Sequence, residues 1–214
     1  HAWHGYFGGM SANAAEGACE CEDAVATLRT IGDPARLAEA LVLCATVLAR
    51  AGEFNRSLDL LGEARDLLEP AGHRWILAIS DLTLAWNLAA LGQLEDAEAA
   101  ARASIERFDV QEEVLLGASS LNALAHIAAA RGDLDSAAAA YEELLRHCRA
   151  TVQHHHEPVS LLALAALRSR RGDDVGADGL YREAIAFGLD PWQSVEAMVG
   201  QAGAARRLGD LIPA

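Results

Sequence analysis

A short glycine-centred motif recurs at nearly constant spacing along this chain of 214 residues, and it constrains the fold more than any other feature of the sequence. In most copies an apolar residue follows two positions after the glycine, and in all copies a small residue follows five positions after it. The five copies read GEFNRS at Gly52, GQLEDA at Gly92, GDLDSA at Gly132, GDDVGA at Gly172 and GDLIPA at Gly209. Three successive intervals are 40 residues long and the last is 37, so the sequence predicts about five similar units.

Each unit has the pattern of two helices separated by its glycine. In the first unit, one face of a helix is indicated by apolar residues three and four positions apart, namely Leu37, Leu41, Cys44 and Leu48. Glycine adopts the left-handed conformation cheaply and is therefore expected to end this helix. A second apolar face follows at Phe54, Leu58, Leu61 and Leu68. Hydrophobic residues make up 52% of the chain but aromatics only 5%, so Ala and Leu dominate, which favours helix over strand.

Small residues recur at two matched places in every unit. Those seven positions before the glycine are Ala45, Ala85, Ala125, Ala165 and Ala202, and those five after it are Ser57, Ala97, Ala137, Ala177 and Ala214. Small residues at both places allow two helices to cross closely as an antiparallel hairpin. A single hairpin cannot bury its apolar face, but stacked hairpins can. The predicted fold is an all-α solenoid of helical hairpins forming a right-handed superhelix.

The pattern also predicts where the array begins and ends. Residues 1–34 are interpreted as a partial N-terminal repeat, with a second helix at about 13–30 and the remnant of a first helix at 1–10. Asp33 and Pro34 are expected to open the next helix as N-cap and first helical residue. Residues 35–214 are predicted to form the repeat array, with a last repeat that is truncated at Ala214. Because the chain also starts without Met, we expect a fragment of a longer protein.

The small residue followed by the glycine motif resembles the tetratricopeptide (TPR) repeat over about residues 35–214. Three features differ from that family. The usual period is about 34 residues, whereas here it is 40. The closing proline is clear only at Pro70, and the position of the large aromatic, four residues before each glycine, holds Leu48, Leu88, Ala128, Arg168 and Ala205. The resemblance implies a TPR-like scaffold that binds a partner.

Phrases such as TIGDPARLAEAL and LAWNLAALGQLEDAEAAARAS are similar to the C-terminal repeats of large bacterial transcription regulators, the LuxR-type ATP-binding regulators and the SARP family. This resemblance implies a regulatory, partner-binding or ligand-sensing arm, with DNA binding and ATP hydrolysis elsewhere in the chain. Two alternatives remain open, namely a general adaptor or assembly module unrelated to transcription, and an α-helical enzyme domain. An adjoining helix-turn-helix or P-loop would favour the regulator, and a closed pocket with convergent polar groups would favour the enzyme.

Charge and cysteine usage exclude several classes of partner and compartment. The formal net charge is −14, which disfavours direct contact with nucleic acid or an anionic membrane and leaves a basic or mixed-charge protein partner. No apolar run approaches the length of a membrane span. The four cysteines are too few and too irregular for a disulfide framework, so a reduced cytoplasmic compartment fits best. Cys44 and Cys148 are predicted to be small buried apolar groups.

Candidate binding residues come from the first helix of each unit, which usually lines the concave face of a solenoid. The position after the small residue gives Thr46, Trp86 and His126, and Asn122 lies four residues before His126. An amide, an imidazole and an indole could together hold a peptide or a small effector. The alternative is that Trp86 belongs to the core and the polar pair is solvated. Arg206, with Arg207, could receive a carboxylate, or could simply complement the helix dipole.

No catalytic, cofactor or metal site is expected. His154, His155 and His156 are adjacent and cannot all point at one ion, and Cys19 and Cys21 have no second pair. Glu142 with Glu143, and Asp173 with Asp174, are interpreted as solvated helix surface because nothing predicts a dry pocket around them. The expected partners are therefore a protein or peptide, which another domain of the parent chain could supply, or a small effector. The truncated last unit exposes an apolar face, so we also expect an end-to-end homodimer.

Overall fold

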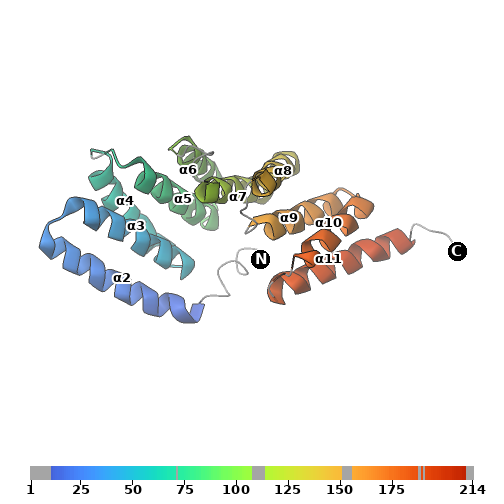
Figure 1. The fold of residues 1–214 in the computed structure, drawn as a ribbon, viewed down its shortest axis with the longest axis horizontal. Coiled ribbons are helices and arrows are strands. Elements are labelled where there is room, and N and C mark those ends of the chain that lie inside the picture. Colours follow the sequence, from blue (N-terminus) through green and yellow to red (C-terminus); the bar gives the residue numbers. More distant parts are fainter. Residues whose placement is uncertain are drawn as a thin grey trace. The chain divides into compact units, whose positions relative to one another are not determined.

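Every regular element among the residues that the structure describes is an α-helix (Figure 1). This computed structural model describes residues 11–70, 72–107, 114–150, 156–187, 189 and 191–210. The helices are α2 (Ser11–Ile31), α3 (Pro34–Arg50), α4 (Phe54–Leu68), α5 (Arg74–Ala90), α6 (Leu94–Arg107), α7 (Val114–Arg131), α8 (Leu134–Ala150), α9 (Glu157–Arg170), α10 (Asp174–Ala186) and α11 (Pro191–Asp210). The helix remnant expected at residues 1–10 and the small residue Ala214 lie outside the described part.

The helices form two compact units, His1–Ala123 and Leu124–Ala214, and the division falls inside α7. In the first unit, α2, α3, α4, α5 and α6 each pack against the next helix along the chain, and α3 also packs directly against α5. In the second unit the same holds for α8, α9, α10 and α11. None of the described helices is both long enough and apolar enough to cross a membrane.

Four of the five motif glycines end a helix as predicted. Gly52, Gly92, Gly132 and Gly172 have φ angles of 83°, 79°, 85° and 80°, in the left-handed region. After each of them, the next backbone N–H donates to a carbonyl five residues back, as Glu53 does to Leu48 at 2.9 Å. Gly32 and Gly72 also have positive φ and follow α2 and α4, so a second glycine series with the same 40-residue spacing ends second helices. The Asp33 carboxylate accepts a hydrogen bond from the Arg36 N–H at 3.2 Å, which confirms the predicted N-cap.

The prediction for the last unit is wrong at Gly209 and Ala202. The helix α11 continues through Gly209 to Asp210, and Gly209 does not have a positive φ. Glycine permits both conformations and costs only about 1 kcal/mol inside a helix, so its presence alone does not end one. Ala202 is exposed, whereas Ala204 is fully buried. The 37-residue interval therefore assigned the wrong register to the final repeat.

The small residues predicted at the helix crossings are buried in four hairpins. Every member of these small-residue pairs is fully buried, namely Ala45 and Ser57, Ala85 and Ala97, Ala125 and Ala137, and Ala165 and Ala177. In the first pair the Ser57 hydroxyl donates to the Ala45 carbonyl oxygen at 2.7 Å and accepts from Asn87 Nδ2 at 2.7 Å. The serine therefore links α4 to both α3 and α5 where the other hairpins use alanine.

The predicted burial of two cysteines is confirmed. Cys44 and Cys148 are both fully buried and are not in disulfides. Burial raises the pKa of the Cys44 thiol to about 11, and the neighbouring Cys21 thiol contributes in the same direction. A thiol with so high a pKa stays protonated at neutral pH, so Cys44 acts as a packing group.

One buried position of the first unit carries a charge where the other repeats carry leucine. Asp81 is 1% exposed, and residues 40 positions away on either side are Leu41 and Leu121, both buried. Its carboxylate bonds to Arg65 of α4 and to Arg107 of α6, the latter with 2.7 Å between Nε and Oδ2. This ion-pair network therefore joins three consecutive helices.

Replacing Asp81 tests what this network contributes. A buried ion pair is often no more stabilising than an apolar side chain that fits the site, and both arginines are about one-third exposed and can turn to water. Asp81→Leu should leave the free energy of unfolding within about 1 kcal/mol of wild type. Asp81→Ala should lower it by about 2 kcal/mol or more, because it leaves a cavity beside two unpaired arginines. Urea unfolding followed by circular dichroism measures both, and equal losses in the two variants would contradict the interpretation.

Two glycines inside α11 provide a matched pair for testing helix packing. A Cβ added at Gly200 would clash with the ring of Tyr181, which is buried, whereas one added at Gly209 would meet nothing within 4 Å. Gly200→Ala should therefore destabilise the protein by about 1–3 kcal/mol through overpacking. Gly209→Ala should be neutral or slightly stabilising, since alanine is the better helix former. Thermal unfolding of the two variants side by side checks this, and similar melting temperatures would contradict the tight α10–α11 contact.

Candidate partner-binding groove

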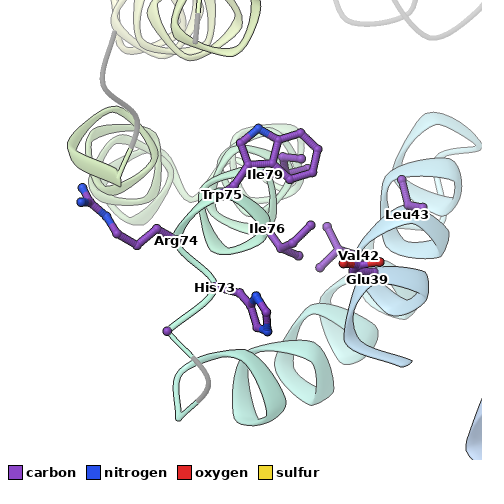
Figure 2. A pocket seen from close by; sticks show the side chains of 9 residues that line it. Glu39, Val42, Leu43, His73, Arg74, Trp75, Ile76 and Ile79 are labelled. Atoms are coloured by element: carbon purple, nitrogen blue, oxygen red, sulfur yellow. The ribbon is translucent and has the colours of Figure 1, made fainter. Parts of the chain in front are cut away.

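A groove of about 530 Å³ lies in the first unit between α3 and the beginning of α5 (Figure 2). These are the first helices of two consecutive repeats, and they pack directly against each other. The lining residues are Glu39, Val42 and Leu43 from α3, the linker residues Gly72 and His73, and Arg74, Trp75, Ile76 and Ile79 from α5. This α3/α5 groove is the candidate functional site.

The groove has a buried apolar floor and an exposed apolar rim. Val42 is 1% exposed, and Figure 2 shows Ile76 pointing across the groove toward it. On the rim, Leu43 is 62% exposed and Trp75 is 49% exposed. Large apolar side chains exposed beside a hollow are typical of surfaces that bind another molecule.

A pair of threonines fixes the distance between the two helices that form the groove. The Thr46 hydroxyl of α3 lies 3.0 Å from the Thr83 hydroxyl of α5. Each hydroxyl also lies within hydrogen-bond distance of a carbonyl of its own helix, that of Val42 for Thr46 at 2.9 Å and that of Ile79 for Thr83 at 3.0 Å. Because Val42 and Ile79 both line the groove, these bonds hold its two walls in register.

The charges at the groove are few and unevenly placed. Glu39 is exposed on the α3 side. On the α5 side, Arg74 points away from the groove, and its guanidinium donates to the carbonyl oxygens of Glu106 and Arg107 at 3.4 Å each (Figure 2). These carbonyls end α6, where a positive charge is favoured by the helix dipole. The groove is therefore apolar with a carboxylate at one edge.

The sequence-predicted binding residues lie outside this groove. Thr46 uses its hydroxyl to bond Thr83, as described above, and Trp86 is partly buried on α5. Asn122 on α7 is only 1% exposed, and its Oδ1 accepts no hydrogen bond from the described residues. Asn122 belongs to the first unit and His126 to the second. The patch predicted from Trp86, Asn122 and His126 stays a prediction.

His126 packs edge-on against Tyr141 of α8, with 5.7 Å between the ring centroids and 81° between the planes. Burial lowers the pKa of His126 to about 4, and His156 acts in the same direction. The imidazole is therefore neutral at pH 7 and belongs to the packing of α7 on α8. Of the three-histidine run, His154 and His155 lie outside the described residues, and His156 is buried.

The two arginines of α11 have different surroundings. Arg206 is exposed. Arg207 binds the Asp174 carboxylate of its own chain, with 3.0 Å between Nε and Oδ1. The Arg207 guanidinium holds the pKa of the Asp174 carboxyl below its ordinary value, with a further contribution from the Ser169 hydroxyl.

The carboxylates considered as acid–base pairs do not converge on a pocket. Glu142 and Glu143 are exposed on α8, and Asp174 is held by Arg207. Across the described ranges, no three His, Cys, Asp or Glu side chains are grouped so that they could hold a metal ion.

The α3/α5 groove was not predicted from the sequence, because the predicted binding residues were chosen at equivalent positions of successive repeats. Leu43 and Trp75 are not among the predicted positions, and Trp75 has no aromatic counterpart 40 residues before or after it. The available signal was the excess of apolar residues at the start of α5, where Trp75, Ile76 and Ile79 accompany the core residue Leu77. A helix apolar on more than one face has a second surface to cover.

Comparison with known proteins shows the fold. No protein-family model matches the chain, and no curated protein matches it by sequence. Among solved structures, it is similar to a crystal structure of nearly identical TPR-like repeats assigned to a kinesin light chain of Podospora anserina. The TM-score is 0.65 at 17% sequence identity, over 86% of this chain and 91% of that one. The predicted fold class is therefore confirmed, and the chain is an all-α TPR-like solenoid of helical hairpins.

The neutral state of His126 predicts a pH dependence of stability. An unfolded histidine has a pKa of about 6.5, and the folded value is about 4, so between these pH values the unfolded chain binds more protons. Stability should therefore fall as the pH is lowered from about 6.5 to about 4, with no further contribution from His126 below that range. His126→Phe keeps an aromatic ring against Tyr141 and should flatten this part of the curve. Urea midpoints measured across the range check this, and parallel curves for wild type and variant would contradict it.

Proposed function

We propose that this chain is a protein-interaction scaffold that binds a segment of another protein in the α3/α5 groove. The observation that carries the proposal is the exposure of Leu43 and Trp75 on the rim of an apolar hollow. Tryptophan anchors dominate the energetics of many protein interfaces, because burying so large a side chain removes much apolar area from water. The TPR-like fold fits this role, since solenoids bind partners along the surface of their repeats.

The charge of the chain indicates the kind of segment that binds. The net charge is −14, and Glu39 stands at the edge of the groove. A basic segment is therefore attracted to the chain, whereas an acidic segment is repelled by it. The partner that fits has a bulky apolar residue for the space between Leu43 and Trp75 and a Lys or Arg within reach of Glu39. An acidic nucleic acid or membrane surface does not fit.

The residues predicted from the sequence, Thr46, Trp86, Asn122, His126 and Arg206, are proposed as further individual contacts of a partner that extends beyond the α3/α5 groove. A small effector is the second candidate ligand, because the groove volume falls within the usual range for small-molecule sites. Two exposed rim residues make the groove too open to enclose such a ligand, which favours the protein segment.

Neither role requires catalysis or a cofactor, and we propose that the chain acts in the cytoplasm as a non-enzymatic module.

A finer proposal is that the chain is the regulatory arm of a larger bacterial transcription regulator. Support comes from the similarity of its Ala-, Leu- and Arg-rich 40-residue repeats to those of LuxR-type and SARP-type proteins. A general adaptor is the alternative. The complete gene distinguishes the two: an encoded helix-turn-helix or P-loop ATPase supports the regulator, and a gene that encodes helical repeats alone overturns it.

Groove binding is tested with a photo-crosslinking amino acid at position 43 in the source cells. The crosslinked protein is identified by mass spectrometry, purified, and titrated against the wild-type chain. The double variant Leu43→Ser, Trp75→Ser should weaken binding at least about tenfold, since two anchors of this kind each contribute more than about 1 kcal/mol.

The matched control is Leu91→Ser, Phe187→Ser, which removes a leucine and an aromatic residue that are 40% and 42% exposed elsewhere. This variant should bind with wild-type affinity. Binding that is unchanged in the groove variant, or weakened equally in both variants, would overturn the α3/α5 groove as the binding site.

A further inference from the structure

Two cysteines lie opposite each other in the hairpin that α2 and α3 form. These helices pack together and are joined by a short turn, so they run antiparallel (Figure 1). Cys21 lies ten residues before Ile31, the last residue of α2, and Cys44 lies ten residues after Pro34, the first residue of α3. Each cysteine is therefore about 15 Å along its helix from the turn, and the two are at the same level of the hairpin.

The two side chains also meet in the interface between the helices. Cys44 is fully buried in the hydrophobic core of the first unit, and Cys21 packs against that core beside Val25, one turn further along α2. Burial raises the pKa of the Cys44 thiol, and the charge of Cys21 and a hydrogen bond between the two side chains raise it further. The two thiols are therefore direct neighbours, as a disulfide bond between them requires.

Two other repeats carry ordinary apolar residues at the equivalent positions. These are Leu61 and Leu84, 40 residues further along the chain, and Tyr141 and Leu164, 120 residues further along. In those repeats α4 packs on α5 and α8 packs on α9 without a thiol at either position. Packing a second helix on the next first helix therefore does not require a pair of cysteines, and leucine is the residue that this fold uses in place of Cys44.

We propose that Cys21 and Cys44 are a redox-sensitive pair that a low-molecular-weight disulfide converts into a disulfide bond between α2 and α3. In the first step the Cys21 thiolate attacks one sulfur of the small disulfide, and the other sulfur leaves and takes up the proton that Cys21 lost. In the second step the Cys44 thiol loses its proton and attacks the Cys21 sulfur, and the second small thiol leaves with that proton. Two protein thiols are oxidised, and one small disulfide is reduced to two thiols.

The surroundings of the two thiols set the order of these steps. Cys21 is only partly buried, so a small disulfide reaches it more easily than it reaches the fully buried Cys44. The pKa of Cys44 is about 11, so this thiol is protonated at neutral pH and is a poor first nucleophile. Once Cys21 is in the mixed disulfide it carries no charge, and it no longer opposes the deprotonation of Cys44.

The bond would attach α2 firmly to α3, the helix on which it chiefly packs. A disulfide limits how far two segments can separate when the structure opens. Because α3 forms one wall of the α3/α5 groove, the same bond would join α2 to a groove helix. The pairing does not depend on what the groove binds.

Oxidation of the Cys19→Ser chain with glutathione disulfide tests the pairing. Free thiols are then alkylated in denaturant, and tryptic peptides are analysed by mass spectrometry without reduction. Cys21 falls in peptide 1–29 and Cys44 in peptide 37–50, and Cys19→Ser leaves one cysteine in each. The two peptides should be linked, at a mass two hydrogen atoms below their sum, and dithiothreitol should separate them. Alkylated Cys21 and Cys44 with no link between them overturn the proposal.

Cys44→Leu in the same background isolates the first step. Leucine occupies the equivalent position in other repeats, so this chain should keep the circular dichroism spectrum of the parent. Cys21 should then carry a glutathione adduct, because no second thiol displaces it. Cys148 is the internal control, since it is as fully buried as Cys44 and should carry neither an adduct nor a link. Equal reaction of Cys148 would mean that oxidation follows unfolding, and it would overturn the pairing in the folded chain.

Hydrogen exchange measures the attachment of α2. In the oxidised Cys19→Ser chain, the amides of residues 21–31 should exchange at least about tenfold more slowly than after reduction, because the bond keeps α2 on α3. The Cys44→Leu chain should show no such difference, and the amides of α10 should exchange alike in both states. A linked chain in which α2 exchanges as fast as in the reduced chain would overturn the proposed attachment.

Discussion

The close crossing of two helices at a pair of small residues is the contact on which the rest of the structure depends. Four such pairs are fully buried, and each sets how deeply one helix lies in the groove of the other. Where the other hairpins have alanine, the first has Ser57, whose hydroxyl bonds to the Ala45 carbonyl and to Asn87. This hairpin is therefore also linked to the next repeat. The hairpin is therefore the unit that fixes the geometry, and the α3/α5 groove lies between two hairpins.

The α3/α5 groove follows from this arrangement because it lies where two first helices meet. The Thr46–Thr83 contact holds them together, and the first turn of α5 leaves Trp75 on the rim. The groove is thus a consequence of how the first helices of consecutive repeats pack against each other.

The sequence predicted what depends on local pattern and missed what depends on neighbours far along the chain. Four glycines with positive φ, the Asp33 cap and the burial of Cys44 follow from short-range propensity and periodicity. The predicted helix end at Gly209 was wrong because a glycine permits a helix to end without requiring it. Asp81 was not predicted as a buried ion pair, since Arg65 and Arg107 are 16 and 26 residues away and only the fold brings them together. The groove was missed for a similar reason, since Leu43 and Trp75 line one groove only when α3 and α5 pack together.

The buried carboxylate of Asp81 also makes the repeats unequal as evolutionary units. A repeat of this kind is ordinarily free to be duplicated, deleted or exchanged, because each one offers its neighbours the same apolar surface. The repeat that contains Asp81 draws one arginine from its own second helix, α6, and the other from the second helix of the repeat before it, α4. Recombination that separated it from that preceding repeat would remove one of the two cations that neutralise a carboxylate in the core. These two repeats are therefore expected to be inherited together, while those on either side can vary in number.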